Sequence, residues 1–202
     1  SFRDRILMRC LATAVITLLS PWLHDASHAY RPGRSYRTAI EAAQEQGNWN
    51  GCWRADIAQC FAMMKPEMAW PTLLASGCPQ WVVIEIGEML QDLAGDCSGL
   101  PEGCPLSPLL CAAGLDPLDR KMSRLGPWIR YADDILAWGI DSLAQTYEAL
   151  DSLGLRLNQT KSKSLADAEF KWLNHDLREP LAMPNQGVSN RTQLMEGRVI
   201  LL

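Results

Sequence analysis

The sequence predicts an α+β fold built on an antiparallel sheet with helices packed on one face. Segments with helical periodicity alternate with short apolar, strand-like segments, but without the regular rhythm of a parallel βαβ protein. The length of 202 residues, with 48% hydrophobic and 21% charged side chains, is that of an ordinary globular protein. A chain of this length suits one domain or two small, closely packed subdomains with an ample core.

Local signals place the elements along the chain. Pro21 should end the first helix, Ser35 should cap the second and Gly47 should stop it. Ser107 and Pro108 should begin a further helix. The expected helices cover residues 3–19, 36–46, 81–93 and 143–153, with a further helix that begins at 107 and runs past 118. The expected strands cover residues 51–57, both arms of 128–138, 156–158 and 170–174. The prolines and glycine beyond about residue 178 predict a loosely packed end.

Charge and cysteine content restrict the possible partners and compartments. The net charge of -4 gives no global field that attracts nucleic acid, so such a partner would need a local basic surface. The 7 cysteines form no CxxC pair, which argues against a zinc site. Free thiols in a reducing compartment are the better interpretation, and we expect a cytoplasmic protein.

The N-terminal segment resembles a secretory signal peptide. Arg3, Arg5 and Arg9 precede an apolar run over residues 11–19, and small residues follow at 26–29. One hypothesis is therefore a processed, secreted protein. The same segment equally predicts a buried helix. An apolar run of about ten residues is too short to span a bilayer, so we expect no membrane partner.

Residues 128–138 hold the strongest chemical signal, an adjacent pair of carboxylates between two apolar, strand-like arms. Asp133 and Asp134 would repel each other in a tight turn unless a cation lies beside them. A polar hairpin turn without a metal is the alternative interpretation. A metal site would need a carboxylate from elsewhere in the chain.

Asp56 is the best candidate for that further carboxylate, because it lies at the end of a predicted strand. If its strand neighbours the hairpin, Asp56, Asp133 and Asp134 could surround a pair of magnesium ions, which prefer oxygen ligands. Two such ions can stabilise the attacking and leaving oxygens of a phosphoryl displacement. The chemistry indicated is attack of a 3′-hydroxyl on a nucleoside triphosphate.

Taken together, the motifs resemble a bacterial reverse transcriptase of the group II intron type. The resemblance runs in the family's order from about residue 3 to about residue 176. Its motifs are RPGRS at 31–35, Asp56-Ile57, GLPEG with SPLL over 99–110, YADD at 131–134, residues 157–162 and residues 172–175. A lone YADD would be weak, but six ordered matches are specific.

The resemblance implies a right-hand polymerase palm with part of the fingers. By resemblance, residues 1–50 are partial fingers, 51–176 are the palm and 177–202 are a loosely structured segment. The implied activity is RNA-directed DNA polymerisation with two Mg²⁺ ions, or Mn²⁺ in their place. The implied partners are an RNA template, a DNA or RNA primer and deoxynucleoside triphosphates; intron RNA or fused domains are further candidates.

The resemblance also assigns roles to individual residues. Asp56 and Asp133 would bind both metal ions, Asp134 would support them, and Ile57 would be a further metal ligand. The implied nucleotide-binding residues are Phe61, Gly99, Pro101, Glu102, Gly103 and Lys161. The implied template or primer contacts are Arg31, Arg34, Ser107, Trp172 and His175.

Several of these roles have a plainer alternative. Phe61 matches an aromatic gate that would crowd a ribose 2′-hydroxyl, but a ring there could simply belong to the core. Lys161 matches a lysine that neutralises the departing pyrophosphate, but it could be a surface lysine. Arg31 and Arg34 match a turn near the template, or form a solvated charged turn. His175 has no cysteine or histidine partner at ligand spacing, which argues against a metal role.

Departures from the family pattern leave alternatives open. Glu102 stands where the family has glutamine, which replaces an amide donor with a carboxylate. The basic fingers strands and the thumb would lie outside this sequence, so we expect a chain truncated at both ends. An intron- or retron-like polymerase, a defence- or CRISPR-associated reverse transcriptase, and a noncatalytic nucleic-acid-binding palm remnant therefore remain competing hypotheses.

Overall fold

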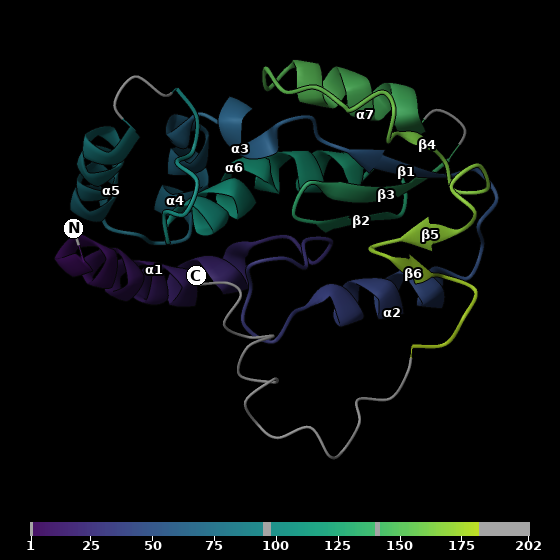
Figure 1. Cartoon of the computed structure of the whole chain (residues 1–202), viewed down its shortest axis with the longest axis horizontal. Helices are drawn as coiled ribbons and strands as arrows, with labels where there is room; N and C mark the ends of the chain where they lie inside the picture. Colours follow the sequence, from purple (N-terminus) through teal and green to yellow (C-terminus); the bar gives the residue numbers. More distant parts are fainter. Residues whose placement is uncertain (1, 95–97, 140–141, 182–202) are drawn as a thin grey trace, which may run out of the picture. The chain divides into compact units, whose positions relative to one another are not determined.

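The computed structural model describes residues 2–94, 98–139 and 142–181 (Figure 1). Contacts divide the chain into two compact units. Among the described residues, the first comprises those up to His24 together with Gln59–Pro117, and the second comprises Asp25–Ala58 and the residues from Leu118 to 181. These limits follow tertiary contacts and differ from the predicted domain limits at residues 50 and 176. Most of the predicted loose segment, residues 182–202, lies outside the described residues.

The first unit is helical. Its elements are α1 (Phe2–Trp22), α3 (Cys60–Met63), the 3₁₀ helix η1 (Pro66–Ala69), α4 (Trp70–Ala75), α5 (Gln80–Ala94) and the greater part of α6 (Ser107–Met122), whose last residues belong to the second unit. The helices over residues 60–75 were not expected from the sequence. Pro21 lies inside the last turn of α1, so the prediction that it ends the helix was wrong.

Helix α1 packs by a stripe of buried side chains, Met8, Ala12, Val15 and Leu19, at helical spacing. It is also the one helix in the described residues with the length and composition of a membrane span, over Arg3–Trp22. That stretch is longer than the apolar run expected from the sequence. Core helices and signal sequences have the same length and composition, so this feature does not identify a membrane protein.

The second unit contains an antiparallel sheet. Its helices are α2 (Tyr36–Gln46) and α7 (Ser142–Asp151). Its four-stranded sheet has the order β2-β3-β1-β4, formed by Trp128–Tyr131, Asp134–Trp138, Cys52–Asp56 and Lys163–Ser164. Strands β5 (Lys171–Trp172) and β6 (His175–Asp176) form a separate two-stranded sheet. The α+β class, the strand before Asp56 and the hairpin agree with the sequence prediction.

The ends of α2 show why this helix could be predicted. The Thr38 hydroxyl accepts a hydrogen bond from the Ser35 backbone N–H at 3.0 Å, so this N–H at the start of the helix has a partner. Gly47 takes a left-handed conformation with φ 60, which ends the helix. Both signals are local, so no knowledge of the surrounding fold was needed.

The sheet carries helices on both faces, which corrects the expectation of helices on one face. Leu136, Ile129 and Cys52 cluster with Ala39 and Ile40 of α2. Side chains alternate between the faces of a strand, so Arg130 points to the opposite face. There it meets Asp119 of α6.

Candidate active site

The sheet register brings Asp56 and the hairpin together. Strand β1 pairs with β3 from Cys52 opposite Trp138 to Asp56 opposite Asp134. Directly opposed residues on antiparallel strands point to the same face. Asp56 and Asp134 therefore share one face at one end of the sheet. The predicted juxtaposition of these two carboxylates is present.

Asp133 lies in the two-residue turn between β2 and β3, where Tyr131 pairs with Asp134. Its carbonyl accepts the backbone N–H of Ile57 at 3.0 Å, which joins the turn to the chain just after Asp56. Ala132, the residue before it, has a φ of 55, a conformation that residues with a Cβ rarely adopt. The turn is thus held in one particular shape by its neighbours.

Two cationic side chains neutralise the carboxylates in this structure. Lys161 Nζ lies 3.0 Å from Asp56 Oδ2, and Arg54 Nη2 lies 3.6 Å from Asp134 Oδ1. The Asp56 side chain is only 6% exposed, whereas that of Lys161 is 56% exposed. An exposed lysine can leave its partner at small cost, because solvent readily hydrates it. The cation on Asp56 is therefore exchangeable.

Burial raises the pKa of both hairpin carboxyl groups. The pKa of Asp134 rises to about 6 because the group is desolvated and because Asp133 and Asp56 repel its charge, although Arg54 opposes the rise. Desolvation and, secondarily, the Asp56 charge raise the pKa of Asp133. Closely placed carboxylates with raised pKa values favour binding of a cation, which relieves their repulsion.

The donor chemistry fits a hard divalent cation such as Mg²⁺, since carboxylate oxygens are its preferred protein ligands. Asp134 Oδ1 is buried and has no hydrogen-bond partner among the described residues. Within those same residues, however, no three acidic, histidine or cysteine side chains are already gathered around a common point. The carboxylates of Asp56 and Asp134 are instead directed to Lys161 and Arg54. A metal ion would thus compete with Lys161.

The predicted nucleotide-binding loop belongs to the first unit, where it packs against the segment of Phe61. The backbone N–H of Leu100 donates to Phe61 O at 2.8 Å. A Cβ on Gly99 would lie 2.2 Å from Ala62 O, so only glycine allows this approach. Two segments that were assigned to one nucleotide site, residues 99–107 and Phe61, are therefore in direct contact.

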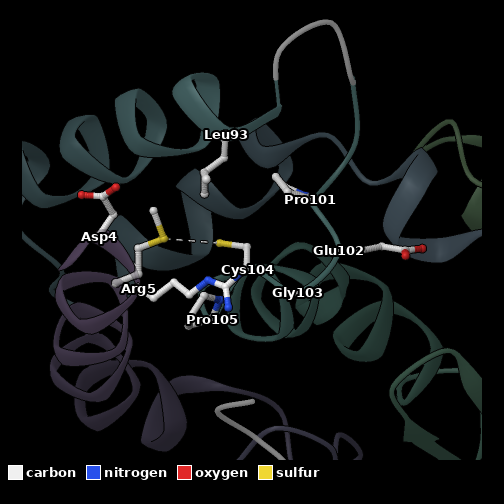
Figure 2. A pocket seen from close by; sticks show the side chains of 9 residues that line it. Asp4, Arg5, Leu93, Pro101, Glu102, Gly103, Cys104 and Pro105 are labelled. Carbon is white, nitrogen blue, oxygen red and sulfur yellow. Dashed lines mark hydrogen bonds between the residues drawn. The ribbon is translucent and has the colours of Figure 1, made fainter. Parts of the chain in front are cut away.

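The same loop borders a small cavity of about 200 Å³, shown in Figure 2. Its lining residues are Asp4, Arg5, Met8, Leu93, Pro101, Glu102, Gly103, Cys104 and Pro105. Cys104 Sγ faces Met8 Sδ at 3.9 Å, while the exposed Glu102 side chain extends away from this pair. The Ser107 hydroxyl, which is buried, donates to Pro101 O at 2.7 Å and closes the loop.

The remaining predicted contacts lie in the second unit in differing environments. Arg31 is 5% exposed and donates to Ser27 O at 2.8 Å, whereas Arg34 pairs with the exposed Asp25 at 2.6 Å. Trp172 is fully buried in the core cluster. His175 Nε2 lies 2.9 Å from Glu179 O. The template and primer roles of these residues and of Ser107 stay predictions; the burial of Trp172 and Ser107 is consistent with support of the backbone.

Sequence reasoning missed two arginines near the turn. Arg54 on β1 faces Asp134, and Arg130 on β2 forms a fully buried ion pair with Asp119. The available signal for Arg130 was a charged residue inside an otherwise apolar strand, since such residues are almost never buried without a partner. Its partner Asp119 could not be found from the sequence, because it lies on α6, and the packing of a helix against a strand is fixed only in the folded chain.

Comparison with known proteins agrees with the geometry. A family model described as reverse transcriptase (RNA-dependent DNA polymerase) matches residues 1–177. A curated protein of Schizosaccharomyces pombe, named "Uncharacterized 91 kDa protein in cob intron", is 28% identical to the chain over 134 residues. The match covers 61% of this chain and 16% of the relative, so the chain spans a small part of that protein.

Proposed function

Because this chain belongs to the reverse transcriptase (RNA-dependent DNA polymerase) family, we propose that it extends a primer 3′-hydroxyl with deoxynucleotides on an RNA template. Its palm would be the sheet that carries Asp56 and the Tyr131–Asp134 turn, and residues 1–50 would be partial fingers. The observation that carries this proposal is the direct pairing of Asp56 with Asp134 beside Asp133. Reverse transcriptases in general use divalent metal ions and bind a template and a primer.

Asp56, Asp133 and Asp134 would hold the metal ions, with the Ile57 backbone adjacent to them. Two bound Mg²⁺ ions would supply stabilisation of the attacking and leaving oxygens in phosphoryl transfer. Lys161 is 56% exposed on its side chain, so it can move from Asp56 toward a departing pyrophosphate. Its positive charge would then neutralise the leaving group. Mn²⁺ offers the same oxygen chemistry as an alternative ion.

The nucleotide would contact Phe61 and the Gly99–Gly103 part of the loop. The packing of Leu100 on Phe61 O supports treating these segments as one structural element. A ring at position 61 would exclude a ribose 2′-hydroxyl and select deoxynucleotides. Arg31, Arg34, Trp172 and His175 would support the template and primer, directly or through the backbone.

The name of the yeast relative suggests an intron context. We propose a group II intron-type enzyme that acts in the cytoplasm on intron RNA. A defence- or CRISPR-associated role would use the same polymerase chemistry and differ in template. The two contexts are separated by sequencing the RNA that co-purifies with the protein.

A noncatalytic, nucleic-acid-binding palm is the second candidate. Two observations favour it. Asp56 and Asp134 form ion pairs with Lys161 and Arg54, and Glu102 occupies the loop position where the family has glutamine. The intact set of three aspartates favours catalysis instead. A direct assay separates the two.

The test is primer extension on an RNA template with Mg²⁺ and deoxynucleotides, using the protein expressed from its complete gene. Asp133→Asn should lower the rate at least about 100-fold, because metal-bound charge stabilisation is worth several kcal/mol. Asp151→Asn, which alters an exposed carboxylate at the end of α7, is the matched control. Equal extension by wild type and Asp133→Asn would refute the catalytic assignment. Absence of extension by wild type would favour the noncatalytic candidate.

A further inference from the structure

Arg130 and Asp119 form a fully buried, bidentate ion pair next to the Asp133 turn. Both side chains are 0% exposed. Arg130 Nε donates to Asp119 Oδ1 at 2.8 Å, and Nη2 donates to Asp119 Oδ2 at 2.5 Å. The Trp128 indole N–H also donates to Asp119 Oδ1, at 2.9 Å. A planar guanidinium held at two points in this way has a fixed orientation.

The fixed orientation directs the rest of the guanidinium group at the turn. Arg130 Nη1 donates to the backbone carbonyl of Ala132 at 2.8 Å, and Nη2 donates to Ser27 Oγ at 3.1 Å. Each nitrogen of the guanidinium group therefore has a partner. The fork geometry matters here, because a lysine ammonium could not serve all of these acceptors from one position.

The Ala132 carbonyl belongs to the peptide group that joins Ala132 to Asp133. Ala132 has the unfavourable φ of 55, so its conformation must be imposed by the surroundings. The hydrogen bond from Arg130 holds that peptide group on one side, and the bond from the Ile57 N–H to Asp133 O holds the following one. Arg130 thereby helps to fix the position of the Asp133 backbone, from which the carboxylate side chain extends.

We propose that Arg130, oriented by Asp119, is a positioning residue that sets the Tyr131–Asp134 turn in the shape required by the carboxylate centre. The inference rests on the proposed function, but its structural part concerns the turn alone. Arg130 acts through the backbone and through no contact with substrate. The pair should therefore affect the rate of the chemical step more than nucleotide binding.

The test compares Arg130→Lys and Asp119→Asn with Leu150→Ala in the protein expressed from its complete gene. Leu150 is fully buried in α7, so its truncation destabilises the fold without altering the ion pair. Three readouts are taken: the melting temperature, the kcat and KM for a deoxynucleotide, and hydrogen exchange of the peptide spanning residues 131–134.

We expect Arg130→Lys and Asp119→Asn to lower kcat about 100-fold while KM changes less than about threefold, as a displaced reacting group would. Exchange at residues 131–134 should become faster in both. Leu150→Ala should keep the wild-type kcat, and hydrogen exchange at residues 131–134 should stay as slow as in the wild type. This should hold even if Leu150→Ala lowers the melting temperature as much as the other two variants do. Asp119→Asn keeps the shape of the side chain, so it serves if Arg130→Lys does not fold.

Normal kcat and turn protection in both variants would overturn the proposal. Equal losses in Leu150→Ala at a matched melting temperature would also overturn it, because the effect would then reflect stability alone. If wild type itself gives no primer extension, the proposed function fails. Hydrogen exchange then still decides whether Arg130 and Asp119 hold the turn.

Discussion

Asp56 and Asp134 lie directly opposite each other on strands β1 and β3, although they are far apart in the sequence. The antiparallel register places both on one face of the sheet, and the turn adds Asp133. Their mutual repulsion is met by Lys161 and Arg54 in this structure. Function and stability should therefore conflict at this site.

Asp134→Asn should stabilise the metal-free protein. The folded-state pKa of Asp134, about 6, lies above its usual value of 3.8, chiefly because of burial. The folded state therefore binds more protons between these values, and stability is lost as pH rises through this window. Near pH 7.5 the variant should gain about 1–3 kcal/mol of unfolding free energy, and near pH 4 the gain should disappear. Urea unfolding at both pH values measures this; an unchanged or lower stability near neutral pH would contradict it.

Lys161→Ala should strengthen the response to Mg²⁺. Removal of the ammonium leaves Asp56 without the cation seen at 3.0 Å, so a metal ion no longer has to displace it. The matched control is Lys171→Ala, because Lys171 forms an ion pair of the same 3.0 Å length with Glu169 and is similarly exposed, at 59%. Thermal melts with increasing Mg²⁺ should show a half-maximal shift at lower concentration for Lys161→Ala alone. Identical titrations for both variants would remove Lys161 from the metal site.

Gly99→Ala should disrupt the loop at residues 99–107. The added methyl group would lie 2.2 Å from Ala62 O, a backbone atom that cannot yield easily. We expect a loss of about 1–3 kcal/mol in urea unfolding. Gly87→Ala is the control, because its Cβ would meet only Trp70 Cζ2 at 3.7 Å and it lies within α5, where alanine should stabilise by about 0.5–1 kcal/mol. A neutral Gly99→Ala would contradict the close packing on residues 61–62.

Phe61→Ala should weaken discrimination between deoxynucleotides and ribonucleotides, if Phe61 acts as the proposed gate. Met63→Ala is a suitable control, since Met63 is a nearby side chain that is 45% exposed. The measurement is the ratio of kcat/KM for the two sugars. Loss of a gate should lower the ratio of deoxynucleotide to ribonucleotide kcat/KM at least about tenfold, because hydroxyl exclusion in a shaped site is worth more than 1 kcal/mol. An unchanged ratio would assign Phe61 to packing.

His28 should make the fold less stable in mild acid. Burial, assisted by Arg34 and Arg31, lowers its pKa from 6.5 to about 4. Between these two pKa values, His28 is protonated in the unfolded chain but not in the folded chain. The free energy of unfolding therefore falls as the pH decreases through this range. His28→Asn should remove up to about 3 kcal/mol of this pH dependence. Equal slopes of stability against pH in both proteins would contradict this.

The features that the sequence predicted correctly depend on local chemistry. The Ser35 and Gly47 ends of α2 and the Tyr131–Asp134 hairpin needed only turn and capping rules. Residues 60–75 were missed because three short helices there lack the several turns that make periodicity visible. The helix on the second face of the sheet could not be predicted, because face assignment depends on tertiary packing.

In the candidate site, too, some residues could be predicted from the sequence and others could not. Asp56, Asp133 and Asp134 stood out by motif and spacing, and the register brings Asp56 and Asp134 together. The Arg130–Asp119 pair was missed because both charges are neutralised only in the folded chain. Trp172 was assigned to the primer by its motif, and this role stays a prediction; that its side chain is fully buried could not be read from the sequence.

The register of β1 and β3 has a consequence for the insertions and deletions that this chain can accept. Five consecutive pairs, from Cys52 opposite Trp138 to Asp56 opposite Asp134, fix which face each side chain occupies. Deleting a single residue within Cys52–Ala55 would shift the alternation by one and send the apolar residues to the wrong face or Asp56 to the face occupied by Arg130. Insertions and deletions in this strand should therefore abolish folding or function far more often than most substitutions in it do.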